Sequence, residues 1–281
     1  MNFFRYLFSL LILTLVLACS NTASRNNQRG NSVSLDTLQY EMKIIDRIYP
    51  MQFHKDKDTT IIKIAYPFFD SSSALGKNLN DTVRERIILG KEDEEGNIIH
   101  INYHTIEDFV DSLLHEYKLF LGDSPISIPW YNYSNVEVLN NTPSLLSLKS
   151  FIRIYLGGMH EDISVVFDNF DTKSGKRLTI DDIFKNKRDK NLLKIGEFYF
   201  KETRKIAQDN KLTDLGIFSA DWSASNPKGG FYFNDNFLID KDYLIFYYNE
   251  YEISSYSFGT TELKISLAEI RPYLKDSFKY E

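Results

Sequence analysis

The pattern of apolar and polar positions predicts strands and helices that occur in groups along the chain. Apolar residues at alternate positions, as at Ile163, Val165 and Phe167, are typical of strands with a buried face. Apolar residues at every third or fourth position, as in residues 75–89, are typical of amphipathic helices. Strands are predicted within 35–66 and at 130–139, 151–156, 163–167, 178–180, 231–233, 236–239, 243–248 and 261–265, and helices at 75–89, 105–121, 190–207 and from Ser266 onward.

The order of these elements predicts the fold class. Strands come in groups with helices between the groups, which favours an α+β fold with largely antiparallel sheets and a few amphipathic helices. No regular strand-helix-strand alternation is apparent. Breaks rich in Gly, Pro and Asn at residues 122–129 and 140–143 indicate two closely packed halves. We expect an N-terminal domain at residues 35–145 and a C-terminal domain at residues 146–281.

Residues 151–184 hold the densest set of local signals. Gly157 and Gly158 end a predicted strand, and two adjacent glycines fit a bulge, a turn with positive φ, or a close backbone approach. Residues 171–176 form a predicted hairpin turn in which Gly175 takes the left-handed conformation. Asp181 or Asp182 is expected to cap a helix that begins near Ile183.

The same residues carry a family resemblance. The patterns are Y-x-G-G-x-H at 155–160, N-F-D-x-x-[ST]-G-K-x-L-x-x-x-D-x-F at 169–184, and Y-x-x-Y-E-I-x-x-Y-x-x-G at 248–259. Together they resemble a domain family of unknown function found in the extracytoplasmic part of the lysozyme-sensing anti-sigma factor RsiV. The family also occurs beside the catalytic domain of the peptidoglycan deacetylase PdaC. The resemblance implies an extracytoplasmic protein with a structural or ligand-contacting role for His160.

The N-terminus has the pattern of a lipoprotein signal. One basic residue, Arg5, precedes an apolar run at residues 7–17, and the small Ala18 stands directly before Cys19. Residues 1–18 are therefore predicted to be a signal peptide, with Cys19 lipidated after cleavage. A coincidental cysteine after an ordinary secretory peptide is the alternative. Residues 19–34 are polar and predict a flexible tether.

Composition excludes several partners and chemistries. Without Arg5 the mature chain has 32 basic and 39 acidic residues, so its formal charge is 32 − 39 = −7. An acidic chain without a basic block argues against nucleic acid, so attachment to the membrane rests on lipidated Cys19. We expect a bacterial cell-envelope protein, lipid-anchored at the outer membrane and facing the periplasm. Cys19 is the single cysteine, which excludes disulfides and thiol nucleophiles from the mature chain.

No cofactor or metal is predicted. His100 and His104 are four residues apart, a spacing that places two ligands on one face of a helix. They precede the helix predicted to start after Thr105, with Asp108 completing a capping box. In an extended chain residues four apart are separated by about 13 Å, too far to share one ion.

Two segments hold the candidate site. His160 follows Gly157 and Gly158 and precedes Glu161 and Asp162, so it could act as a general base oriented by one of those carboxylates. The alternative is a turn whose polar groups satisfy the local backbone. Tyr251 and Tyr256 lie outside the predicted strands in a tyrosine-rich loop, where rigid amphipathic rings are typical of recognition surfaces.

These observations predict a non-enzymatic binding module for an envelope protein, such as a lysozyme-like hydrolase, or for a glycan. The predicted ligand-binding residues are Gly157, Gly158, His160, Tyr251 and Tyr256. Two alternatives remain open: a peptidoglycan-modifying enzyme that uses His160 and neighbouring carboxylates, and a structural partner of another envelope component.

Overall fold

The computed structural model describes residues 38–50, 59–88, 91–92, 98–99, 103–123, 128–220 and 228–280. The predicted signal peptide, Cys19, the tether and His100 lie outside the described residues. The chain divides into two units, Met1–Ser34 and Leu35–Glu281. All elements described below belong to the second unit.

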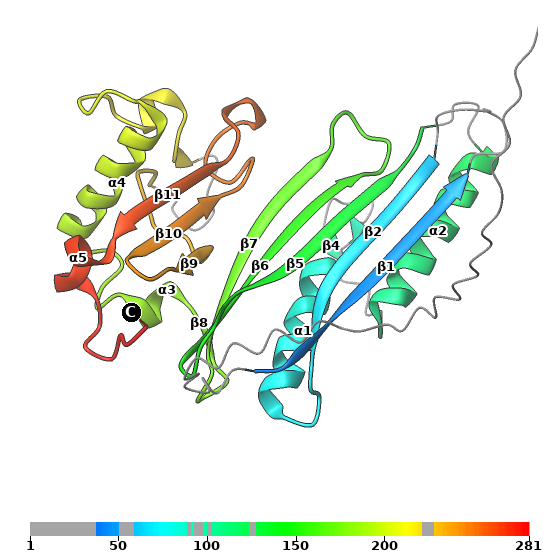
Figure 1. Ribbon diagram of the computed structural model, residues 1–281. Coiled ribbons are helices and arrows are strands. Elements are labelled where there is room, and N and C mark those ends of the chain that lie inside the picture. Colours follow the sequence, from blue (N-terminus) through cyan, green and yellow to red (C-terminus); the bar gives the residue numbers. More distant parts are fainter. Residues whose placement is uncertain are drawn as a thin grey trace, which may run out of the picture. The chain divides into compact units, whose positions relative to one another are not determined.

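A six-stranded sheet forms the frame of this unit (Figure 1). Each neighbouring pair is antiparallel except β2 and β5, which are parallel. The strands lie in the order β1 (Tyr40–Pro50), β2 (Thr59–Phe69), β5 (Tyr131–Asn141), β6 (Leu145–Tyr155), β7 (Asp162–Asp171) and β8 (Arg177–Leu178).

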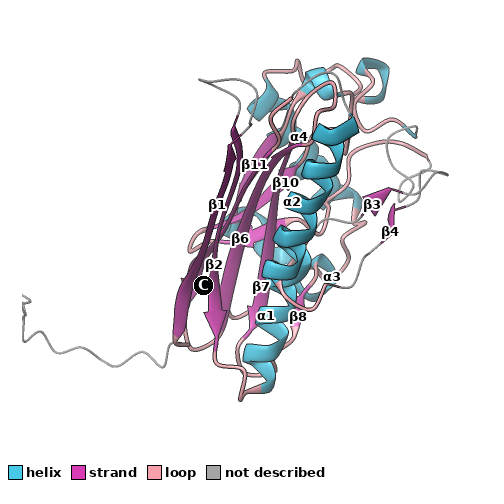
Figure 2. Cartoon of the chain, turned by 90° about the vertical axis from the view of Figure 1, so that its right-hand side faces the viewer, coloured by secondary structure: helices cyan, strands magenta, loops and turns pink. Residues whose placement is uncertain are grey.

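Two helices cover one face of this sheet (Figure 2). Helices α1 (Ala74–Ile87) and α2 (Ile106–Asp123) both lie between β2 and β5 in the chain, together with the short pair β3 (Lys91–Glu92) and β4 (Ile98–Ile99). This crossover allows β2 and β5 to be parallel, the one parallel pair in a sheet that is otherwise antiparallel. The capping box predicted at Thr105 is confirmed, since the Thr105 and Asp108 side chains each accept the other's backbone N–H.

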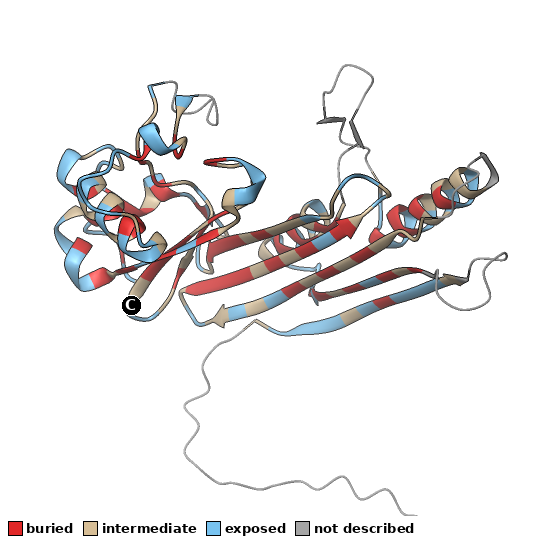
Figure 3. Ribbon diagram, turned by 90° about the horizontal axis from the view of Figure 1, so that it is seen from above, coloured by how far each residue is buried: buried red, intermediate tan, exposed pale blue. Residues whose placement is uncertain are grey.

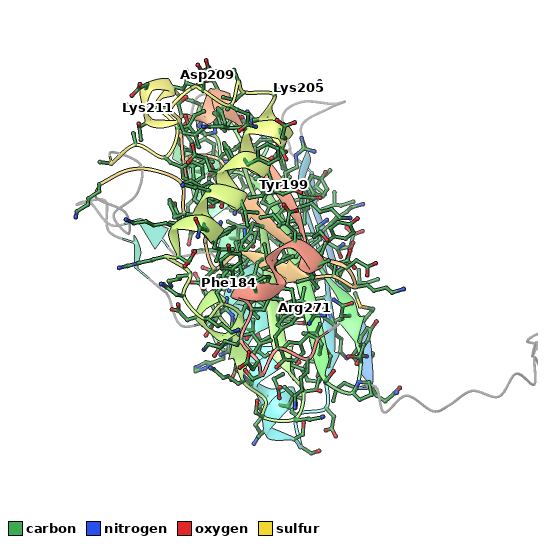
Figure 4. The ribbon with its side chains drawn as sticks, turned by 90° about the vertical axis from the view of Figure 1, so that its left-hand side faces the viewer. Phe184, Tyr199, Lys205, Asp209, Lys211 and Arg271 are labelled. Atoms are coloured by element: carbon green, nitrogen blue, oxygen red, sulfur yellow. The ribbon has the colours of Figure 1, made fainter. Side chains whose placement is uncertain are left out.

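A second layer of elements follows β8. A three-stranded antiparallel sheet has the order β11 (Thr261–Ser266), β10 (Tyr243–Tyr248) and β9 (Phe237–Ile239). The helical segments are α3 (Ile180–Ile183), α4 (Lys190–Arg204), α5 (Leu267–Ile270) and the 3-10 turns η1 (Thr213–Leu215), η3 (Tyr256–Phe258) and η4 (Arg271–Tyr273). Figure 4 looks onto α4 and labels Tyr199, which hydrogen-bonds to Glu269 of α5.

Two hydrophobic cores hold these layers together (Figure 3). One lies between the six-stranded sheet and helices α1 and α2, and the other lies around α4 and the three-stranded sheet. Adjacent residues of β6 serve different cores, because Leu145 belongs to the second and Leu146 to the first. This is the alternation expected of a strand with both faces buried.

The predicted α+β class with largely antiparallel sheets is confirmed. The proposed boundary between residues 145 and 146 lies at the start of β6, and β6 pairs along its length with β5. The six-stranded sheet therefore takes strands from both of the proposed domains.

Two local predictions are wrong. Residues 231–233 form no strand; Phe231 and Phe233 are buried and pack against α4 instead. Helix α3 begins at Ile180 and its N-cap is Thr179, because Asp182 at the third helical position reaches back to accept the Thr179 backbone N–H. The predicted hairpin turn is confirmed, with Gly175 at φ +72°.

Gly196 is required where α4 meets the loop that contains Phe231 and Phe233. A Cβ at residue 196 would lie 2.4 Å from a ring carbon of Phe231 and 2.5 Å from one of Phe233. Helix propensity alone favours Ala over Gly by about 1 kcal/mol. We expect Gly196→Ala to destabilise instead, by about 1–3 kcal/mol, because overpacking displaces two buried rings. Urea unfolding measures whether the free energy of unfolding falls or rises. An unchanged or raised stability would contradict this packing.

No helix in the described part of the chain is long and apolar enough to cross a membrane.

Candidate functional site

The candidate site lies where two loops meet. One loop joins β6 to β7 and contains Gly157, Gly158 and His160; the other follows β10 and contains Tyr251 and Tyr256. Both loops leave the ends of strands, where side chains can be presented without disturbing a sheet.

Gly157 satisfies two requirements of the first loop. Its φ of +85° is a conformation that L side chains adopt only with strain. A Cβ here would also lie 3.3 Å from Nε1 of Trp130, an atom that is buried. The Tyr155 hydroxyl donates to the Gly158 carbonyl oxygen at 3.0 Å and so closes the turn. The positive-φ turn, one of three possibilities left by the sequence, is the conformation observed.

Two asparagines fasten the second loop region to β7. The Asn249 side chain accepts the Val165 backbone N–H at 2.8 Å and donates to the Val165 carbonyl oxygen at 3.0 Å. Asn236 accepts the Phe167 N–H at 2.8 Å and also donates to the Val165 carbonyl, at 2.7 Å. These side-chain amides make the hydrogen bonds that a neighbouring strand would otherwise make along this edge of β7. Asn249 directly follows β10, so it brings the loop with Tyr251 to the strand that begins just after His160.

The partly buried carboxylate of Glu252 holds the second loop through two hydrogen bonds. Glu252 accepts the Asn249 backbone N–H at 2.9 Å and an Asn234 side-chain N–H at 2.6 Å. Burial raises the pKa of Glu252, and these two hydrogen bonds oppose the rise. Between Asn249 and Glu252 the chain turns sharply, and Tyr251 adopts φ +61°. Backbone strain of this kind persists only where the surroundings hold it, as these hydrogen bonds do.

Arg204 holds the far end of the same loop. It comes from the last turn of α4 and donates to the carbonyl oxygens of Thr260 and Phe258, at 3.0 and 2.6 Å. Its guanidinium also lies 3.8 Å from the centroid of the Phe258 ring. The segment that carries Tyr256 is therefore fixed at both ends.

These anchors bring three predicted residues together in what we call the His-Tyr cluster: His160, Tyr251 and Tyr256. The His160 and Tyr256 rings stack with centroids 4.3 Å apart and planes inclined by 21°. The Tyr251 hydroxyl lies 3.2 Å from Nε2 of His160, and the two tyrosine rings are 5.6 Å apart. Tyr251 is 49% exposed and Tyr256 36%, so the cluster forms part of the surface.

The hydrogen bonds of His160 define its tautomer. Nδ1 lies 2.9 Å from the backbone carbonyl oxygen of Glu161, which can only accept, so Nδ1 carries a proton. In the neutral ring Nε2 is then an acceptor, and the Tyr251 hydroxyl donates to it. The imidazole is thus oriented by a backbone group and a tyrosine.

The neighbouring carboxylates have other partners or lie farther away. The Glu161 carboxylate accepts from Arg153 at 2.6 Å and from the Tyr131 hydroxyl at 2.5 Å, and these hydrogen bonds lower the pKa of Glu161. Oδ1 of Asp162 lies 3.9 Å from Nδ1 of His160, beyond hydrogen-bond distance. The general-base alternative therefore lacks an orienting carboxylate hydrogen-bonded to His160.

Nearby carboxylates give the cluster a negative electrostatic potential. Desolvation raises the pKa of Tyr256, and Glu250, Glu161 and Asp162 add to the rise. The Asp162 side chain is 80% exposed. The charge of Glu161, by contrast, is paired with Arg153. The raised pKa keeps the Tyr256 hydroxyl neutral at physiological pH, and the excess of carboxylates near this ring favours a cationic partner.

The structure thus brings His160, Tyr251 and Tyr256 into contact, and places Gly157 and Gly158 in the turn that delivers His160. Their role in binding stays a prediction. Sequence reasoning missed the residues that position them: Asn249, Glu252 and Arg204. The signal that could have found Asn249 is an asparagine immediately after a strongly apolar strand, where its amide can serve an exposed strand edge.

Metal binding has no obvious location among these residues. Within the described ranges, no group of three or more His, Cys, Asp or Glu side chains could hold a metal ion. His104 lies just before α2, as predicted.

Comparisons with known proteins agree with the fold. A family model described as "Protein of unknown function (DUF3298)" matches residues 181–268, which include Tyr251 and Tyr256 but not His160. A search of curated proteins found no match.

Two solved structures are similar over most of the chain. A DUF3298 family member from Bacteroides fragilis has a TM-score of 0.63 and 22% identity, over 85% of this chain and 95% of its own. A DUF3298 family protein from Pseudomonas aeruginosa has a TM-score of 0.58 and 18% identity, over 86% of this chain and 96% of its own. At these identities the likeness establishes the fold.

Proposed function

We propose that the protein is a lipid-anchored binding module of the bacterial cell envelope, and that the His-Tyr cluster contacts its ligand. The observation that carries the proposal is the surface contact of His160 with Tyr251 and Tyr256. The rings are pre-positioned by Asn249, Glu252 and Arg204, so ligand binding would cost little conformational entropy.

A basic envelope protein, such as a lysozyme-like hydrolase, is the partner that the charges favour. The chain has a formal net charge of −6, and the carboxylates of Glu250, Glu161 and Asp162 are near enough to Tyr256 to contribute to its raised pKa. Opposite charge accelerates association and makes it sensitive to salt. A glycan is the second candidate, because exposed tyrosine rings can stack on sugars.

Replacing both Tyr251 and Tyr256 with Ala tests the site. We expect affinity for a lysozyme to fall by about tenfold or more, since aromatic anchors at interfaces contribute about 1–2 kcal/mol or more each. The melting temperature should change little, because both rings are substantially exposed. Calorimetry in low and high salt, with muropeptides as a second probe, separates the two ligand classes.

The matched control is Phe198→Ala, which removes an exposed aromatic ring from α4, outside the cluster. If the control lost as much affinity for the ligand as the double variant does, the cluster would not be the binding site. Turnover of peptidoglycan by the wild-type protein, lost in His160→Ala, would instead establish the enzymatic alternative.

Lipid anchoring is tested separately with Cys19→Ser. The sequence V-L-A-C at residues 16–19 motivates this variant, which we expect to remain unprocessed or to leave the membrane fraction. Fractionation and the mass of the processed chain provide the measurement. Normal processing and normal membrane association of the variant would refute lipidation at Cys19.

A further inference from the structure

Strand β1 is a long edge of the six-stranded sheet. It pairs with β2 at all of its 11 residues, from Tyr40 opposite Phe69 to Pro50 opposite Thr59. Among the described residues no strand pairs with its other side, whereas the opposite edge of the sheet ends in the two-residue β8. Long exposed edges are templates for pairing with another strand unless they are interrupted or covered.

The side chains of β1 are unusually apolar for an exposed edge. Ile44 is 76% exposed and Ile48 60% exposed, and Met42 on the same face is also exposed. These residues alternate with Lys43 and Arg47, whose side chains project from the other face of the strand.

The backbone of β1 offers hydrogen-bonding groups on its outer side. The Arg47 guanidinium donates to the Asp46 carbonyl oxygen at 3.2 Å, which indicates that this carbonyl points away from β2. Backbone groups alternate in direction along an antiparallel strand, so Met42, Ile44 and Ile48 would also direct their N–H and C=O groups outward. The exposed large hydrophobic side chains of β1 belong to these three residues and to Tyr40.

We infer that β1 is an interface for a second copy of this chain, which adds its own β1 antiparallel across a two-fold axis at Ile44. In this register Ile44 lies opposite Ile44 of the second copy, Met42 opposite Asp46, and Tyr40 opposite Ile48. On the other face Glu41 lies opposite Arg47, once on each side of the axis. The inference does not depend on the proposed binding function.

The charges select this register over its neighbours. If the register between the two copies of β1 shifts by two residues in one direction, Lys43 lies opposite Arg47. If it shifts by two residues in the other direction, Lys43 lies opposite Lys43 of the second copy. Like charges directly opposite each other destabilise a strand pair, and opposite charges stabilise it. Only the register centred on Ile44 matches each Glu41 with an Arg47. The two six-stranded sheets then continue as one, with α1 and α2 of both copies on the same face.

Disulfide crosslinking of the full-length protein in membranes tests the register. Ile44→Cys places two thiols directly across the axis, where opposite Cα atoms are about 5.5 Å apart, within the range of a disulfide. We expect Ile44→Cys to form a covalent dimer on mild oxidation. Ile48→Cys alone should not, because its counterpart is Tyr40, but Ile48→Cys combined with Tyr40→Cys should.

Two controls make the test specific. Met159→Cys, at a fully exposed residue in the β6–β7 loop, measures dimers formed by random collision. The unsubstituted chain under the same oxidation measures any crosslink through Cys19. Since Ile44 is exposed, its substitution should leave the melting temperature almost unchanged.

Charge reversal provides an independent readout. Glu41→Arg or Arg47→Glu alone should lower the crosslink yield of Ile44→Cys about fivefold, the effect of two exposed ion pairs. The combined Glu41→Arg and Arg47→Glu variant should restore the yield. A yield from Ile44→Cys no higher than that from Met159→Cys, or charge variants without effect and without rescue, would overturn the inference.

Discussion

Replacing Asp168 with alanine is expected to lower the free energy of unfolding by about 3–5 kcal/mol, the cost of breaking a buried ion pair by removing one partner. The Asp168 side chain on β7 is fully buried. It accepts two hydrogen bonds from Arg86 of α1, both at 2.8 Å, and forms an ion pair with Arg177 of β8. Without the carboxylate, two guanidinium groups would be left close together without their shared counter-ion.

The pKa values of the two arginines shift in opposite directions. Hydrogen bonds to Asp168 raise the pKa of Arg86, whereas desolvation lowers the pKa of Arg177 despite the same carboxylate. Arg86 donates to both oxygens of the carboxylate, and Arg177 forms an ion pair with one of them. Asp168 connects helix α1 to β8, and β8 leads directly into α3. Its loss should therefore loosen the start of the C-terminal layer as well as the sheet.

Asp181→Ala is the matched control for this prediction. Asp181 also forms an ion pair, with Lys187 at 2.8 Å, but its side chain is largely exposed. Exposed pairs contribute about 0–1 kcal/mol, so this variant should unfold almost as the wild type does. Urea denaturation of both variants gives the comparison. If Asp168→Ala lowered the free energy of unfolding as little as Asp181→Ala does, the ion pairs of Asp168 would contribute little to stability.

The second large effect is expected at Phe200, the centre of the core around α4. Its ring is fully buried and contacts Phe218, Phe231 and Tyr248, at centroid distances of 5.0, 6.1 and 6.0 Å. It also packs against Phe258, next to the loop of the His-Tyr cluster. Phe200→Ala should destabilise the protein by about 3–5 kcal/mol through lost burial and the cavity left behind.

Phe198→Ala, two residues earlier in the same helix, separates packing from helix propensity. Phe198 is 47% exposed, and both variants replace phenylalanine by alanine within α4. Alanine is the better helix former, so Phe198→Ala should change stability by less than about 1 kcal/mol. The difference in melting temperature between the two variants measures the buried contribution. Equal melting temperatures would contradict the burial of Phe200.

The sequence determined the local elements because their signals are short-range. Apolar residues at helical spacing predicted α1 and α4, alternation predicted β7, and the Thr105 and Asp108 pair predicted the start of α2. Turn chemistry likewise placed Gly175 in its left-handed conformation. Each of these features depends on residues within a few positions of one another.

Local signals failed where a distant contact decides the conformation. Phe231 and Phe233 alternate like a strand, but they pack against Gly196 instead of pairing, since burial beneath α4 satisfies both rings. The parallel pairing of β2 and β5 likewise follows from two helices covering one face, which no short stretch of sequence encodes.

The candidate site divides in the same way. The sequence by itself singled out Gly157, His160, Tyr251 and Tyr256, because glycine pairs and clustered tyrosines are recognisable residue by residue. Only the tertiary structure decided that His160 and Tyr251 meet, although 91 positions separate them. The reason is physical: backbone groups at the edge of β7 need hydrogen-bond partners. The Asn249 side chain, 84 positions after Val165, bonds to the N–H and C=O of Val165 and so brings the two loops together.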